Sequence, residues 1–314
     1  MVLAGGVGGA RFLLGMRDAA REDGHEVEAV VNTADDAWVA GLRVTPDLDS
    51  IMYALAGVND TERGWGRAGE TERVSAELSA WGAGWPWFTL GDLDLGAHIT
   101  RTSWLREGMP LGQVARRLAA RWDLGITLLP ASDDEFETRV ITADGDLHFQ
   151  EWWTRYRASI PAIRFEQRGP GPVRPGEGVV EAILGADAVL VAPSNPVVSI
   201  GTILAVPGIR DALAATSAPV VGLSPIIGGA VLRGMADACL ATIGVATAAD
   251  AVAAHYGARA EGGLLDGWLV DDADAALVPG IEALGIRSAA RPLILRDPAA
   301  RIDIARAAVA MAGG

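Results

Sequence analysis

Two pairs of aspartates are the residues whose type and spacing most clearly suit chemistry. Asp35 and Asp36 follow the apolar run Val27–Val31 in the sequence NTADD, and Asp47 and Asp49 lie in TPDLDS. Carboxylates repel a phosphate unless a hard cation lies between them, and Mg²⁺ accepts one or two carboxylates together with phosphate oxygens. Turn formation and helix capping are the structural alternative. We expect Mg²⁺ at Asp49 and at one of Asp35 and Asp36, with Asp35 taken as the ligand and Asp36 as a substrate contact.

A glycine-rich loop lies ahead of these acids, in MVLAGGVGGARF. Glycines permit a tight turn and a close backbone approach, and the free N–H groups of a following helix favour an anion. Neither familiar phosphate-binding pattern fits, because all 26 basic residues are arginine and Arg11 stands where the dinucleotide pattern needs a glycine. Gly6 and Gly8 therefore predict a nucleotide-type ligand held in a third way, with a plain turn as the alternative.

His98 and Arg101 lie in a third polar stretch, GDLDLGAHITR. Three residues apart, they share one face if the segment is helical. Arginine binds phosphate oxygens through two parallel N–H groups, and histidine can relay a proton. A surface ion pair is the alternative, so we expect a substrate contact here only together with the other motifs.

Ser194 and Asn195 follow the run Ala188–Val191 and stand between two prolines in APSNP. Proline cannot continue a central strand, so the strand ends here and displays both side chains. Nothing in a sheet would use their polar groups. We expect them to contact a nucleotide or phosphate.

The elements that position these residues are short apolar strands alternating with helices. Expected strands include Val2–Ala4, Val27–Val31, Ala188–Val191, Val220–Leu223, Trp268–Val270 and Leu293–Leu295, and expected helices 202–215, 231–243 and 298–312. Continuous apolar strands between helices predict an α/β fold: a Rossmann-like parallel sheet with helices on both faces. Ligands of such sheets lie beyond the carboxyl ends of the strands, where the polar loops fall.

The alternation is lost from about residue 61 to 175. We expect residues 1–60 and 176–314 to form the nucleotide-binding core and residues 61–175 an inserted, smaller, α-rich cap. A hairpin with its turn at Asp144–Asp146 lies within it. Eight of the ten tryptophans fall here, most of them as core filler: Trp65, Trp81, Trp85, Trp87, Trp104, Trp122, Trp152 and Trp153. The remainder could offer a stacking surface to a flat ring.

Composition narrows the class of protein. The net charge of −14 argues against a nucleic-acid or anionic-membrane partner, and it requires any phosphate site to be built locally. A single cysteine, Cys239, excludes a disulfide framework. The polar loop at residue 5 leaves no room for a signal peptide, and no unbroken apolar run would span a bilayer. We expect a cytoplasmic protein.

The motifs together resemble the 2-phospho-L-lactate transferase family of coenzyme F-420 biosynthesis. The resemblance rests on GGVGGARF, VNTADD, PDLDS, GDLDLGAHITR, LPASDDE, HFQEWW, APSNPVVSIG and SPIIGG, with GLLDGWLVDD further on. The Trp-rich, all-arginine version is similar to the actinobacterial branch. Each motif alone is weak, and the combination is specific.

The resemblance implies a Rossmann-like, commonly dimeric, Mg²⁺-dependent enzyme. Such an enzyme transfers a three-carbon phospho-acid from a guanosine diphosphate-linked donor to the ribityl hydroxyl of the deazaflavin Fo and releases GMP. Asp49 would hold Mg²⁺ or accept the hydroxyl proton, Gly6, Gly8, Ser194 and Asn195 would bind the nucleotide, and the cap with His98, Arg101 and Trp152 would position Fo. The alternatives are a nucleotide-sugar-binding regulatory protein without turnover and an NAD-dependent oxidoreductase, and the failed dinucleotide pattern argues against the second.

Overall fold

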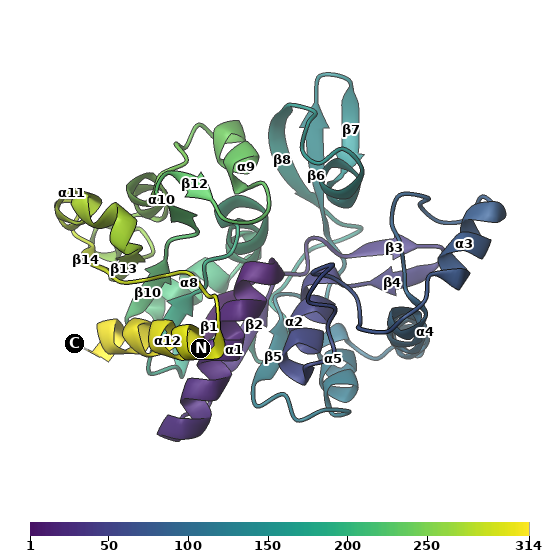
Figure 1. Cartoon of the computed structure of the whole chain (residues 1–314), viewed down its shortest axis with the longest axis horizontal. Coiled ribbons are helices and arrows are strands. Elements are labelled where there is room, and N and C mark those ends of the chain that lie inside the picture. Colours follow the sequence, from purple (N-terminus) through teal and green to yellow (C-terminus); the bar gives the residue numbers. More distant parts are fainter. Residues whose placement is uncertain (314) are drawn as a thin grey trace.

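The centre of the molecule is a seven-stranded sheet, seen in the computed structural model, which describes residues 1–313 (Figure 1). All its strand pairs are parallel. The order is β14-β13-β10-β9-β1-β2-β5. The strands are β1 Val2–Ala4, β2 Glu28–Val31, β5 Thr127–Pro130, β9 Val189–Val191, β10 Val220–Leu223, β13 Gly267–Val270 and β14 Arg287–Ala290. The predicted α/β fold with a Rossmann-like sheet is confirmed.

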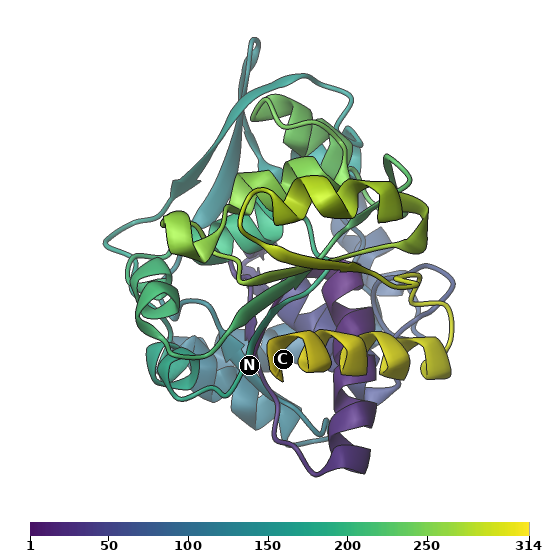
Figure 2. The ribbon, with the colours of Figure 1, turned by 90° about the vertical axis from the view of Figure 1, so that its left-hand side faces the viewer.

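Helices cover both faces of this sheet (Figure 2). Side chains alternate between the faces along each strand, so Val2 and Ala4 pack into one apolar cluster and Leu3 into the other. The first cluster contains residues of α1 Gly6–Asp23, α2 Pro46–Ala56 and α12 Pro298–Gly313. The second contains residues of α6 Val179–Leu184, α8 Ile209–Ala215 and α10 Ala249–Tyr256. Burial on both faces explains why the four central strands β1, β9, β10 and β13 contain no charged or hydroxyl side chain.

The chain reverses its direction of winding between β1 and β9. From β1 it proceeds outward through β2 to β5, and it then returns to β9 on the other side of β1. The loops that follow two neighbouring strands diverge at such a point and leave a crevice for a ligand. The glycine loop and the Pro193–Pro196 loop are these two loops.

Three expectations for the core are corrected. The strand β5 lies within the segment expected as cap, because its apolar run pairs with β2 as the sheet's edge. The last strand is β14 Arg287–Ala290, whereas Leu293–Leu295 is irregular backbone. The helix expected over 202–215 is two helices, because Pro207 and Gly208, with φ of +98°, break it.

The predicted cap contains strands as well as helices. Strands β6 Glu137–Thr142, β7 Gly145–His148 and β8 Ala162–Arg168 form an antiparallel sheet, separate from the core in Figure 1. The hairpin β3 Ala37–Val39 and β4 Leu42–Val44 extends from the segment expected as core. The remaining elements are α3 Arg73–Ala80, α4 Asp92–Arg106, α5 Leu111–Ala119, η1 Glu151–Arg155, η2 Pro196–Ile200, α7 Gly201–Ala205, β11 Ile226–Ile227, β12 Ala230–Val231, α9 Ala236–Thr242, η3 Arg259–Glu261, η4 Asp272–Leu277 and α11 Val278–Glu282.

Within residues 1–313, no single helix is long and apolar enough to cross a membrane. The segments Pro196–Ala205 and Ile209–Ala215 reach the required length and apolarity only when taken together, and the chain bends by 84° between them.

Candidate functional site

A cavity of about 580 Å³ lies at the carboxyl ends of the central strands. The glycine loop, the aspartate-rich segments, the Pro193–Pro196 loop and aromatic residues of the predicted cap all contribute to its wall. Among the residues predicted from the sequence, those that line it are Gly6, Gly8, Asp35, Asp49, His98, Ser194 and Asn195. Asp36 and Arg101 do not line it.

The glycine loop is packed against the loop that follows β9. Ser194 Oγ accepts a hydrogen bond from Gly5 N at 3.1 Å and donates one to Gly5 O at 2.7 Å. A Cβ on Gly8 would lie 2.5 Å from Pro193 O, so a larger residue would force the loops apart. Gly6 has φ of +61°, a conformation that favours glycine. The loop therefore holds the start of α1 against the cavity, at the end of the helix that favours an anion.

Asn195 has a structural role as well as a place in the cavity wall. Its Oδ1 accepts hydrogen bonds from Val197 N at 2.9 Å and Val198 N at 3.2 Å, and so caps η2. Its Nδ2 is buried and has no hydrogen-bond partner among residues 1–313. The expectation that the sheet would leave both polar side chains free is wrong for Ser194 Oγ and Asn195 Oδ1, and Asn195 Nδ2 is the group left without a hydrogen bond.

Asp35 and Asp47 form the first group of acids in the cavity wall. Asp47 Oδ2 accepts a hydrogen bond from Asn32 Nδ2 at 3.0 Å, and burial raises the pKa of Asp47 to about 6. Burial, followed by the charge of Asp47, raises the pKa of Asp35 well above its ordinary value. Asp35 Oδ1 is buried without a hydrogen-bond partner in the described chain. Two buried carboxylates with an unpartnered oxygen fit a hard divalent cation, which would stabilise their ionised forms.

Asp36 belongs to the protein interior. It is buried, its Oδ2 lies 3.3 Å from Arg43 Nη2, and burial raises its pKa to about 8. The β3–β4 hairpin supplies Arg43, and a hairpin partner cannot be read from a local motif. The expectation that Asp36 touches the substrate is therefore not met by its position.

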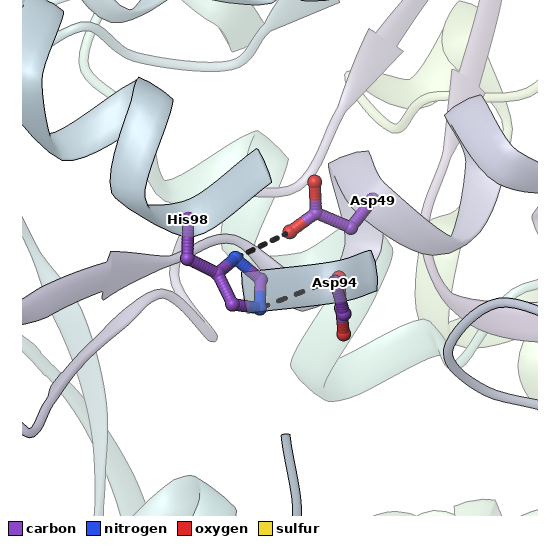
Figure 3. A group of neighbouring side chains, drawn as sticks. All are labelled: Asp49, Asp94 and His98. Carbon is purple, nitrogen blue, oxygen red and sulfur yellow. Dashed lines mark ion pairs between the residues drawn. The ribbon is translucent and has the colours of Figure 1, made fainter. Parts of the chain in front are cut away.

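Asp49, Asp94 and His98 form the second acidic group, with ligand atoms within 4.8 Å of one another (Figure 3). His98 Nδ1 lies 3.7 Å from Asp49 Oδ2, and His98 Nε2 lies 3.3 Å from Asp94 Oδ1. Tyr53 OH donates to Asp94 Oδ1 at 2.7 Å. Burial raises the pKa of Asp94, but His98 and the Tyr53 hydrogen bond outweigh it, so that the net shift is downward. This group offers an ionised carboxylate beside an imidazole.

Arg101 positions the second acidic group. Its guanidinium is fully buried; Nη2 pairs with Asp49 Oδ1, and Nη1 donates to Arg43 O at 3.1 Å. His98 Nδ1 lies 2.9 Å from Arg101 Nη1. The residue therefore holds Asp49 and His98 in place, and its N–H groups do not face the cavity as we had expected.

Three residues of the two acidic groups, Asp47, Asp94 and Tyr53, were not among the predicted site residues. In the sequence, turn formation was enough to explain Asp47, and no partner residue was evident for the Asp94 carboxylate. The four-residue spacing of Asp94 and His98, which places both on one helix face, was the available signal for the second. Tyr53 carried no signal, because its contact with Asp94 joins two helices.

A family model described as 2-phospho-L-lactate transferase CofD matches residues 1–280. The chain belongs to this family. A relative from Mycobacterium sp. (strain JLS), named phosphoenolpyruvate transferase, is 52% identical over 329 residues, covering 99% of this chain and 98% of the relative. Proteins of the same name from Nocardia farcinica and Thermobifida fusca are also 52% identical, with 94% and 97% of their lengths covered. The chain is thus a transferase, as the motifs predicted.

The fold of this transferase also resembles a solved structure from a more distant group. A crystal structure of a UPF0052 family member from Bacillus halodurans superposes with a TM-score of 0.62 at 17% identity, covering 98% of both chains. At that identity the likeness concerns the fold alone.

Aromatic side chains form another part of the transferase cavity wall. Trp65, Trp87, Phe149 and Trp153 line it. Trp152, expected to face the substrate, is buried and donates from Nε1 to Ile160 O at 2.7 Å. The neighbouring residue Trp153 lines the cavity instead of Trp152.

Proposed function

We propose that this transferase acts in coenzyme F-420 biosynthesis and moves a three-carbon phospho-acid onto the deazaflavin Fo. The donor is a guanosine diphosphate-linked phosphoenolpyruvyl or 2-phospholactyl group, the acceptor is the terminal ribityl hydroxyl, and the products are dehydro-F-420-0 or F-420-0 and GMP. Membership of the family and the names of its relatives support the reaction class. The observation that carries the proposal is the cavity in which a glycine loop, four aspartates and an aromatic wall meet.

The reaction needs little covalent chemistry from the protein. The Fo hydroxyl oxygen forms a bond to the donor's β-phosphorus, the bond between that phosphorus and the oxygen bridging to the α-phosphorus breaks, and GMP leaves with the electron pair. The hydroxyl proton passes to a base. Positioning of the two substrates and neutralisation of the phosphates therefore account for the rate.

The N-terminus of α1 would hold the donor's diphosphate. Gly6 and Gly8 line the cavity there, and the start of a helix favours an anion. Asn195 Nδ2, unpartnered and buried, is a further donor for the guanosine diphosphate. Ser194 acts on the loop, because its hydroxyl is already bonded to Gly5.

Asp49, in the second acidic group, would accept the hydroxyl proton or bind Mg²⁺, and Asp35, beside Asp47 in the first group, would supply a further ligand. Bound Mg²⁺ would neutralise charge on the diphosphate. Arg101 and His98 keep the Asp49 carboxylate oriented, and Tyr53 does the same for Asp94. A carboxylate held in a fixed orientation in the cavity wall is the group that proton acceptance requires.

Product analysis by mass spectrometry tests the reaction and identifies the donor. Purified protein is incubated with Fo, Mg²⁺ and, separately, the phosphoenolpyruvyl, 2-phospholactyl and phosphoglyceryl guanosine diphosphates. We expect an Fo-derived product that carries the added phospho-acid from at least one donor, with an equal amount of GMP. Tight donor binding without product would instead support the regulatory alternative.

We also propose a homodimer that binds neither nucleic acid nor membranes and works in the cytoplasm. The net charge of −14 supports the absence of nucleic acid and anionic membranes among the partners. Light scattering of the purified protein measures the oligomeric state directly.

A further inference from the structure

A second, smaller cavity of about 240 Å³ adjoins the first. The two cavities share part of their walls, including Val7 and Arg11 of the first turns of α1, Gly64, Arg233 and Arg296. The smaller cavity is thus a side chamber next to the glycine loop.

Every charged residue in the wall of this side chamber is an arginine. Arg11, Arg233, Arg296 and Arg301 line it, and no aspartate or glutamate does. The protein as a whole is negatively charged, with 40 acidic and 26 basic residues, whereas the wall of the side chamber is positively charged.

The pairing of these arginines leaves two of them available. Arg296 lies 3.2 Å from Asp297 Oδ2, and Arg301 Nε donates to Asp297 O at 3.2 Å. Arg11 and Arg233 have no ion-pair partner among residues 1–313. Burial, followed by the charges of Arg233 and Arg301, lowers the pKa of the Arg11 guanidinium. An anion between these side chains would relieve their repulsion and receive paired N–H donors.

The acidic residues of the main cavity lie elsewhere in its wall. None of Asp35, Asp47, Asp49 and Asp94 lines the side chamber. No protein carboxylate in the side chamber would therefore repel an anionic ligand, and the ligand can bind there without a metal ion. The proposed donor carries three anionic groups, two phosphates and the carboxylate of its three-carbon acid, and that carboxylate is attached within a few bonds of the β-phosphorus.

We infer that the side chamber binds the carboxylate of the donor's three-carbon acid, through Arg11 and Arg233. This inference rests on the proposed function and adds to it the determinant of donor specificity. The chamber selects donors that bear a carboxylate beside the transferred phosphate, and it leaves the guanosine diphosphate to the glycine loop and the main cavity.

Two small phosphates that differ only in the carboxylate provide the test. 2-Phospho-L-lactate has the acid, and ethyl phosphate is the same molecule without it. Binding of both, and of inorganic phosphate and GDP, is measured by calorimetry on the wild type, Arg11→Gln, Arg233→Gln and the control Arg164→Gln. Arg164 is exposed on β8 and lines neither cavity.

We expect the wild type and Arg164→Gln to prefer 2-phospho-L-lactate over ethyl phosphate by about ten-fold or more, the gain from one charged hydrogen-bonded contact. Arg11→Gln and Arg233→Gln each abolish most of that preference and change GDP affinity less than two-fold. Equal weakening of GDP and 2-phospho-L-lactate would overturn the inference, because the arginines would then bind the diphosphate. So would a wild type that fails to bind 2-phospho-L-lactate or to prefer it.

The binding measurements need neither Fo nor turnover, so the two proposals fail separately. If the protein prefers the carboxylate-bearing phosphate but has no transferase activity on Fo, the inference about the side chamber stands and the proposed reaction is rejected. If the protein turns over the intact donor but shows no preference for the carboxylate, the proposed reaction stands and the inference about the side chamber is rejected. Melting temperatures verify that each glutamine variant is folded, which we expect because Arg11 and Arg233 are exposed.

Discussion

The acidic wall and the arginine side chamber hold opposite charges in different surroundings. Asp35, Asp47, Asp49 and Asp94 are each less than a tenth exposed, and the last three pair with Asn32, Arg101 and Tyr53 respectively. Arg11 and Arg233 are exposed and enter no ion pair with the described residues. The acids are fixed before any ligand arrives, whereas the arginines acquire partners only when an anion binds.

This difference separates two ways of binding a charged substrate. Buried carboxylates lose hydration, which raises the pKa values of Asp35 and Asp47 and favours a cation among them. The two arginines of the side chamber have no acidic partner, and they can attract an anion without a cofactor. We therefore expect changes in the acidic wall to affect catalysis and stability together, and changes in the side chamber to affect binding alone.

The largest effect should come from Asp49→Asn. We expect transfer to fall by about 1000-fold, because a fixed charge at the reacting centre is lost. The substitution would also leave the buried Arg101 without the negative charge of Asp49. This loss lowers the free energy of unfolding by about 3 kcal/mol. Initial rates are measured at a temperature at which circular dichroism shows the variant folded.

Asp92→Asn is the matched control for that variant. Asp92 is exposed in the first turn of α4 and lines neither cavity, so its rate should stay near that of the wild type. An Asp49→Asn protein with normal turnover and normal Mg²⁺ dependence would refute the role given to this carboxylate.

The second effect is a loss of stability with rising pH when no divalent cation is present. The folded-state pKa values of Asp47, about 6, and Asp36, about 8, lie above the ordinary value of 3.8. The folded state therefore holds more protons than the unfolded state, and its stability declines as the pH rises from about 4 through 6 and on through 8. Arginines do not titrate in this range, so the acidic wall and its neighbour Asp36 account for the effect.

Thermal melts between pH 5 and 8.5 measure this decline. Asp47→Asn should remove the part centred near pH 6, and Mg²⁺ should protect the wild type increasingly as the carboxylates ionise. A melting temperature that is constant or rises over this interval without divalent cation would show that the acids are not buried as described.

A third, smaller effect concerns the acceptor. Trp153→Ala should weaken Fo binding about ten-fold, the value of a lost stacking surface, and leave GDP affinity unchanged. Trp81, 83% exposed and outside both cavities, provides the control variant Trp81→Ala. Quenching of tryptophan emission reports Fo binding, and equal losses for Fo and GDP in Trp153→Ala would assign the residue a structural role only.

A fourth effect, of similar size, concerns Asn195. Asn195→Ala is expected to raise the donor's KM about ten-fold through the loss of the Nδ2 donor, and to cost about 1 kcal/mol through the loss of the helix cap. Asn195→Asp retains the capping oxygen, so it should raise the KM at a nearly normal melting temperature. A normal KM in both variants would leave Asn195 as a cap alone.

The sequence predicted the sheet well because buried parallel strands are apolar along their whole length. Val2–Ala4 and Val220–Leu223 show this pattern, and both are strands. The same apolar pattern was misleading at Leu293–Leu295, where a short apolar run packs on the core without pairing as a strand. The strand β5 was missed because helices separate it from the preceding strands along the chain.

The candidate site was predictable where one short motif holds both the chemistry and its position. Asp35 and Asp49 follow this rule, because each is close to the end of a strand or the start of a helix. Pairings across long sequence distances were not predictable: Arg101 with Asp49 spans 52 residues, and Ser194 with Gly5 spans 189. Such contacts depend on packing, for which the sequence has no local signal.

Fo-dependent GMP release tests the central claim most directly. Metal-free protein is mixed with the guanosine diphosphate-linked donor, and GMP is measured with and without Fo and with and without Mg²⁺. We expect GMP release only when Fo and Mg²⁺ are both present, in a one-to-one ratio with the Fo product. Release that is independent of Fo, or unchanged in the presence of a chelator, would contradict the claim.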